Sequence, residues 1–273
     1  MTKRAWQFSL FLMIAAIAVP SLLAQSETEF DSYKVRVGGF WFHSNPSGDI
    51  EASNGSDTIN LQKDLGFDTY STFVGKVDWR FTRKNHLYLV GADFTQDRQH
   101  VLTRTITYQG QTFEVGLTTS AHLAAPLIAP GYQYDILRRK RGHLGIAVQI
   151  DLFNASAAIS AKAQVVNGMQ FPAVSASSSL LAPIPVAGPE ARFYLTNSPR
   201  VFVEGNLNGM YLFGYGNFIS TGDNIGVTIN KHLSVNAGYL LGTRLIVTNN
   251  SSSNRIGIHL TQSGAIVGAE VSF

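Results

Sequence analysis

Apolar and polar residues alternate along most of this chain. In the stretch Ser71–Arg83, the residues Phe73, Val77 and Trp79 share one face of an extended segment, and charged residues occupy the other face. The stretch His143–Phe153 repeats this pattern with aliphatic residues against small or polar ones. A period of two predicts β-strands that have one apolar face and one polar face.

The alternation and the turn residues between the stretches predict ten strands. The sixth strand is the weakest, because Pro183, Pro185 and Pro189 each remove a backbone hydrogen-bond donor. We therefore expect only its last part to pair, and a count of eight strands remains an alternative. The predicted strands are 33–43, 71–83, 86–97, 117–137, 143–153, 188–195, 201–213, 224–229, 233–247 and 254–273.

The predicted connections are long and short in turn. Three long segments, Ser44–Tyr70, Arg98–Gly116 and Asn154–Ser179, follow odd-numbered strands, and short turns follow even-numbered strands. Alternation around Gln109-Gly110 predicts a protruding hairpin in the second long segment, and the Ala- and Ser-rich third segment is expected to be irregular. Long connections on one rim and short turns on the other are typical of a barrel that spans a membrane.

The last strand carries the most specific signal. Its residues Val271 and Val267 share one face, and Glu270 lies on the opposite face, where Ile266 is the exception. The chain ends with Phe273 after this alternation, which resembles the small outer-membrane β-barrel proteins of Gram-negative bacteria. That resemblance implies a single antiparallel, porin-like transmembrane barrel in the cell outer membrane, surrounded by lipid and lipopolysaccharide. It also implies recognition of the Phe273 strand by the barrel-assembly machinery.

Composition and the N-terminal segment support an exported barrel. Residues 1–24 read as a signal peptide, with Lys3 and Arg4 before the apolar run Phe8–Val19 and cleavage expected after Ala24, so the barrel would occupy residues 25–273. The chain has no Cys, only 14% charged residues and a net charge of +3. Removal of Lys3 and Arg4 lowers that charge further, so the balance gives no indication of nucleic-acid binding.

Charged residues gather on the face that would point into the barrel. Opposite charges enclosed together are expected to pair, because an isolated charge in a low-dielectric interior is costly. A lumen filled by ion pairs is the first expectation, and a polar conduit or small-ligand pocket lined by the same residues is the alternative. The expected inward set is Arg36, Lys76, Asp78, Arg80, Asp93, Asp97, Asp135, Asp151, Glu190, Arg192, Glu204 and Glu270.

No catalytic, cofactor or metal site is predicted. The seven His residues lack metal-site spacing, and His86, His143 and His232 are expected beside solvated periplasmic turns. The alternative is an enzyme at the extracellular rim, similar to omptin-like proteases or lipid A-modifying barrels, which would use His43-Ser44 or Asp97 with His100.

The basic run Arg138–Arg141 and a set of aromatic residues are both given structural interpretations. The basic run is expected in a solvated turn that faces lipid phosphates or peptidoglycan. The sequence therefore favours an integral outer-membrane barrel with a structural or loop-mediated interaction role, with a narrow passive route for small solutes as a variant. Apart from the lipid, the lipopolysaccharide and the assembly machinery, the sequence predicts no substrate, solute or partner and no oligomeric state. The aromatic residues expected in interfacial girdles are Trp41, Trp79, Phe81, Tyr88, Tyr132 and Tyr211.

Overall fold

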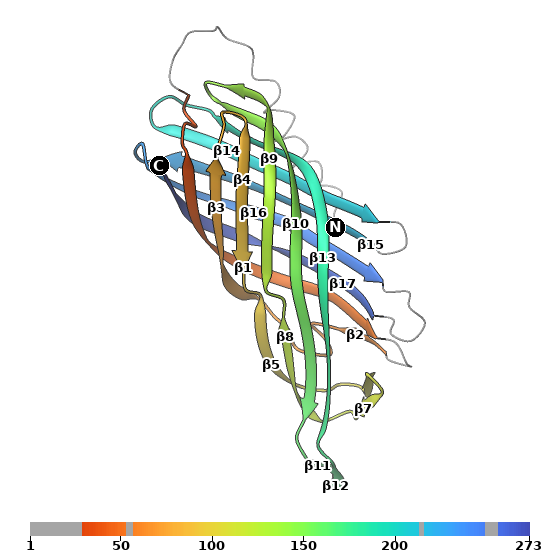
Figure 1. The fold of residues 1–273 in the computed structure, drawn as a ribbon. Helices are drawn as coiled ribbons and strands as arrows, with labels where there is room; N and C mark the ends of the chain where they lie inside the picture. The colour runs from red at the N-terminus through yellow and green to blue at the C-terminus, as the bar shows by residue number, and fades with distance from the viewer. Residues whose placement is uncertain (1–28, 53–56, 213–215, 249–255) are drawn as a thin grey trace.

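The computed structural model describes residues 29–52, 57–212, 216–248 and 256–273, so the predicted signal peptide lies outside the described residues. The described chain forms a closed barrel of ten antiparallel strands with shorter strands beyond one rim (Figure 1). No helix in these residues is long and apolar enough to cross a membrane. The barrel strands are β1 (Val35–Ala52), β3 (Tyr70–Arg80), β4 (Asn85–Ala92), β9 (Leu127–Arg139), β10 (Gly142–Ala161), β13 (Val174–Tyr194), β14 (Arg200–Leu212), β15 (Gly216–Thr228), β16 (Leu233–Thr248) and β17 (Ile256–Ser272).

The first and last strands meet and close the barrel. Strand β1 pairs with β17 along its whole length, for example through Val37 opposite Val271, and β10 pairs with β13 on the far side. The backbone N–H of Phe273 donates to the Val35 carbonyl at 2.8 Å. Each predicted strand has a counterpart in the barrel, so ten strands are present and not eight.

Two differences from the predicted strands concern their ends. The segment 154–179 was expected to be irregular, yet β10 continues to Ala161 and β13 begins at Val174. The prediction of a loop at 215–221 is also wrong for residues 216–221, because β15 begins at Gly216. Only residues 213–215 separate β14 from β15. The alternation of long and short connections is therefore not strict. The short turns 81–84, 140–141, 195–199 and 229–232 nevertheless all lie on one rim, which we call the turn rim.

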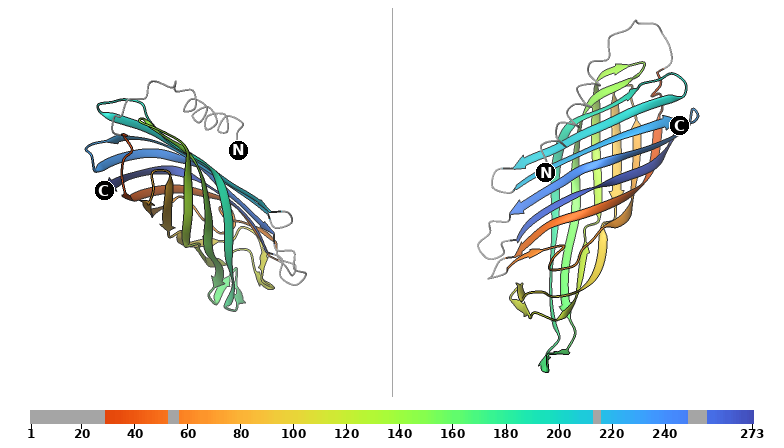
Figure 2. Two further views of the ribbon diagram at one scale, coloured as in Figure 1. Left: turned by 45° about the horizontal axis from the view of Figure 1, so that its top comes forward. Right: turned by 180° about the vertical axis from the view of Figure 1, so that it is seen from behind.

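The opposite rim carries an extension made of short strands and the ends of β10 and β13 (Figures 1 and 2). A predicted hairpin is confirmed within it, since β6 pairs with β7 across Gln109 and Gly110, which both have positive φ. The extension has its own apolar core, which includes Ile59, Phe113 and Ile159. Its strands are β2 (Thr58–Asn60), β5 (Thr95–Val101), β6 (Ile106–Tyr108), β7 (Gln111–Phe113), β8 (Thr118–Ala124), β11 (Gln164–Val166) and β12 (Met169–Phe171).

The outer face of the barrel is apolar. Side chains such as Phe73, Ile128 and Val267 are 74%, 57% and 50% exposed, while charged residues of the same strands are buried inside. Strand β4 differs from the prediction, because Tyr88 faces the interior and Leu87 faces outward. This strand is apolar on both faces, so the period of two could not reveal its orientation.

Candidate functional site: an ion-pair plug below an apolar cavity

The half of the lumen near the turn rim is filled by charged side chains, which we call the plug. Arg192, only 2% exposed, lies at its centre and donates to Glu270 at 2.6 Å and to Glu204. Such buried guanidinium–carboxylate pairs offset the cost of removing both charges from water. The predicted lumen of ion pairs is therefore present in this half.

Asp31 completes the plug, although it lies in no strand. Its carboxylate contacts Arg36, Arg80 at 3.1 Å and His143 at 3.0 Å. The segment that precedes β1 therefore enters the lumen. Sequence reasoning missed Asp31 because this residue precedes the first recognised alternation.

Two of the three histidines near the turn rim are buried and not solvated, contrary to the prediction. His86 is fully buried and bridges Asp78 at 3.2 Å and Asp135 at 3.1 Å. His143 is 3% exposed and faces Asp31. Both face inward in strands that surround the plug, so carboxylates replace water around their rings. His232 is exposed as expected.

Most of the expected inward set points into the lumen, but Asp93 and Asp97 do not. Both are exposed in or before β5, because the chain leaves the barrel wall after Ala92 and enters the extension. Arg138 is a further correction, since its side chain is buried and bonds Asp135 at 2.8 Å, whereas the basic run was expected to be solvated. The turn that follows starts only at residue 140.

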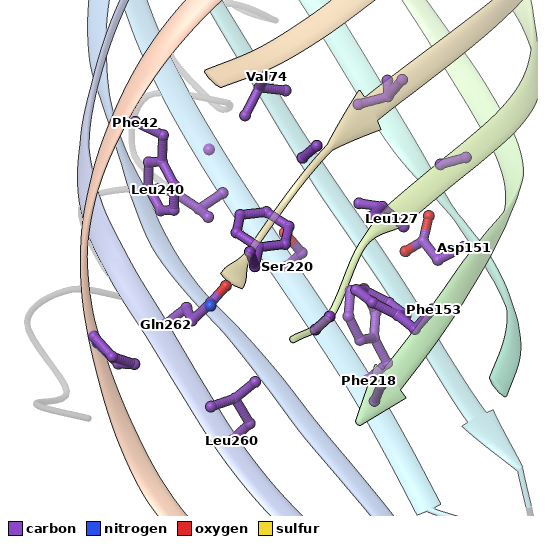
Figure 3. A pocket seen from close by; sticks show the side chains of 18 of the residues that line it. Phe42, Val74, Leu127, Asp151, Phe153, Phe218, Ser220, Leu240, Leu260 and Gln262 are labelled. Carbon is purple, nitrogen blue, oxygen red and sulfur yellow. The ribbon is translucent and has the colours of Figure 1, made fainter. Parts of the chain in front are cut away.

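The half of the lumen toward the extension contains a partly enclosed cavity of about 330 Å³ (Figure 3). Its wall is mostly aromatic and aliphatic, and all ten barrel strands and the short strands β5 and β8 contribute residues to it. Sequence reasoning had expected charged residues here. Side chains that form the apolar wall include Phe40, Phe42, Tyr70, Val74, Tyr88, Val90, Phe94, Leu123, Leu127, Phe153, Phe218, Leu240, Leu260 and Ile266.

Polar groups lie where the cavity meets the plug. Lys76 Nζ is 3.7 Å from Glu190 Oε1, so these two charges offset each other. The Tyr88 hydroxyl donates to Gln149 Oε1 at 2.9 Å, and Gln149 Nε2 donates to Asp151 Oδ1 at 2.5 Å. The cavity is therefore a mainly apolar chamber with a short hydrogen-bonded chain on one wall.

The residues considered for an enzyme at the rim are not brought together. His43 is exposed and stacks on Trp41 with ring centroids 5.5 Å apart, whereas the next residue, Ser44, is fully buried on the opposite face. Asp97 pairs with His122 at 2.8 Å and not with His100. The enzyme at the rim was the alternative interpretation, and the alternation of β1 places its neighbouring residues His43 and Ser44 on opposite faces of the strand.

The aromatic girdle is only partly as predicted. Trp41, Trp79 and Phe81 are exposed on the outer face, but Tyr88 is inside, and the Tyr211 side chain lies outside the described residues. No group of three or more His, Asp or Glu side chains able to hold a metal ion occurs in the described parts of the chain.

A closed barrel with an apolar outer surface and charges inside is the architecture of a transmembrane β-barrel. No protein-family model and no curated protein matches the chain. Among solved structures, the chain is similar to the outer membrane protease OmpT from Escherichia coli, at 12% identity and a TM-score of 0.46, over 90% of this chain and 100% of that one. It is also similar to the NalP translocator domain from Neisseria meningitidis, at 10% identity and a TM-score of 0.41, over 100% and 98%. At these values, neither likeness carries a function to this chain.

Proposed function

We propose that this chain is an integral outer-membrane barrel with a non-enzymatic binding role. The outward apolar side chains support the location, since a closed barrel with this surface suits a lipid bilayer. The observation that carries the binding role is the apolar cavity between the plug and the extension. Its volume falls in the range of about 300–1,000 Å³ that is usual for small-molecule sites.

The plug argues against the passive route for solutes. Buried ion pairs around Arg192 cross the lumen between the cavity and the turn rim, and separating them would leave charges without partners. We therefore expect the purified protein to stay electrically silent in planar bilayers. Steady single-channel currents would contradict this part of the proposal.

The binding role is tested with phenylbutanol, a soluble apolar probe, added to the protein in amphipol and followed by calorimetry. Gly222 lines the cavity, and a Cβ there would meet only ordinary contacts, the nearest at 3.5 Å from Leu240. Gly222→Leu should therefore fill space in the cavity without a backbone clash and weaken binding at least about tenfold. Unchanged binding, or no binding to the unaltered protein, would refute the proposal.

A role for Phe273 in assembly is a separate proposal. Its side chain is 68% exposed, while its backbone is held by β1. A carboxyl-terminal ring that the fold leaves uncovered is available to the barrel-assembly machinery. Removal of Phe273 should lower the amount of barrel recovered from outer membranes, and leave refolding of the pure chain in detergent unchanged. Equal recovery in cells would rule out this role.

A further inference from the structure

The apolar cavity contains one carboxylate that the plug does not neutralise. Asp151 is 2% exposed and lines the cavity, and its carboxylate points into it (Figure 3). Oδ1 accepts a hydrogen bond from Gln149. In the described residues, no ion pair joins Asp151 to any Lys, Arg or His side chain.

The other charged groups beside the cavity have partners. Lys76 is paired with Glu190, and Glu204 is paired with Arg192. A carboxylate buried without a cation is costly in a low-dielectric interior. A cation that enters the cavity would lower this cost through a charge-assisted hydrogen bond.

The surroundings of Asp151 define the rest of such a ligand. Phe153 and Phe218 lie beside it on the cavity wall, with Leu127 nearby (Figure 3). These side chains offer dispersion contacts and no hydrogen bonds, so they suit an apolar body. A single carboxylate on an apolar wall suits a single positive charge.

We propose that the cavity binds a small amine with an apolar body, whose ammonium group donates a hydrogen bond to Asp151. This inference rests on the proposed binding role and adds the chemical class of the ligand. The ammonium group would complete the chain that runs from Tyr88 through Gln149 to Asp151. The apolar body would occupy the space between β10, β15 and the ends of β1 and β17.

The test compares three probes with the same apolar body: phenylbutylamine, phenylbutanol and phenylbutyrate. Their affinities for the full barrel in amphipol are measured by calorimetry at neutral pH. The amine should bind at least about tenfold more tightly than the alcohol, and the carboxylate should bind most weakly. Equal binding of amine and alcohol would overturn the inference.

Asp151→Asn keeps the size of the side chain and removes its charge. It should abolish the preference for the amine and leave phenylbutanol binding within about twofold, because the apolar wall is unchanged. Asp97→Asn is the matched control, since it makes the same change at an exposed carboxylate outside the cavity; it should keep the preference. An amine preference that survives in Asp151→Asn would also overturn the inference.

These outcomes separate the two proposals. If Gly222→Leu weakens all probes but the amine has no advantage, the binding role stands and the ligand class is wrong. If none of the probes binds, both proposals are wrong. The comparison of probes on the unaltered protein decides the ligand class even where Asp151→Asn does not fold.

Discussion

At the scale of single residues, Arg192 holds the plug together. Its guanidinium contacts Glu204 and Glu270 and lies 3.9 Å from Asp31, and its side chain is 2% exposed. Arg192→Met should cost about 3–5 kcal/mol, because it leaves buried carboxylates without a partner. The loss is measured by urea unfolding of the barrel in detergent.

Arg83 provides the control for this prediction. It also binds a carboxylate, Glu29, at 2.6 Å, but its side chain is 71% exposed. Arg83→Met should change stability by only about 0–1 kcal/mol, since exposed pairs are screened by water. Equal effects of the two substitutions would show that burial does not determine the strength of the plug.

Gly131 makes room for an inward-facing ring. A Cβ at this position would lie 2.3 Å from the Tyr88 ring. Gly131→Ala should therefore destabilise the barrel by about 1–3 kcal/mol, because the ring must leave its place in the packed wall. Gly75→Ala is the control, since nothing lies within 4 Å of its added Cβ. Unfolding curves that shift equally for both would contradict this packing.

The sequence alone did not show which inward-facing residues line the cavity. The inward positions of β1 change from Arg36 through Gly38 to Phe40 and Phe42 along the strand. Ile266, the exception noted on the last strand, belongs to the same wall. Alternation indicates which face of a strand a residue occupies, but it does not show which residues of different strands lie at the same level along the barrel axis. That alignment depends on the register, which tertiary pairing determines.

At the scale of elements, β13 shows why the strand ends were predicted less well than the strands. Pro183, Pro185 and Pro189 are separated by even numbers of residues, so their missing N–H groups lie along one edge. The ladder to β10 is continuous, whereas the ladder to β14 is interrupted between Ala187 and Glu190. The prolines therefore occupy the edge where pairing with β14 ends, and the strand can be long despite them.

The extension depends on a clasp between Asp64 and Arg104. Arg104 donates to Asp64 at 2.7 Å and 3.0 Å, and the Asn60 backbone N–H donates at 2.8 Å. Partial burial works to raise the pKa of Asp64, but the hydrogen bonds from Arg104 and Asn60 outweigh it and hold that pKa below its usual value.

Because the folded pKa of Asp64 is lowered, the clasp stabilises the extension above the ordinary carboxyl pKa of about 3.9. This contribution is lost as the pH falls through the lowered folded value. The protection factors of the β2 amides, which correct for the intrinsic pH dependence of exchange, should therefore fall on acidification from pH 5 to about pH 3, and Asp64→Asn should show the lower protection already at pH 5. Identical exchange in both proteins at pH 5 would contradict the clasp.

At the scale of the whole molecule, one half of the lumen is filled by the plug and the other half contains the cavity. The closed ten-stranded architecture and its polarity could be predicted, because the period of two and the turn residues are local signals. Ion pairs between inward-facing charges were predicted, but the contribution of Asp31 was not, since this residue belongs to a segment outside the strands that enters the lumen. A small-ligand pocket lined by the charged residues was considered as an alternative, but the apolar wall of the cavity was not predicted, because it depends on side chains from strands that are distant in the sequence.

The edge of β13 that β14 leaves unpaired affects self-association. Among the described residues, the part of β13 that precedes Ala187, residues 174–186, has no partner in β14, and an unpaired edge of this kind can pair with a strand of another molecule. Pro183 and Pro185 deny an incoming strand two donors along this edge. Crowded copies in a bilayer should thus stay apart, whereas Val at both positions should give cross-linkable dimers.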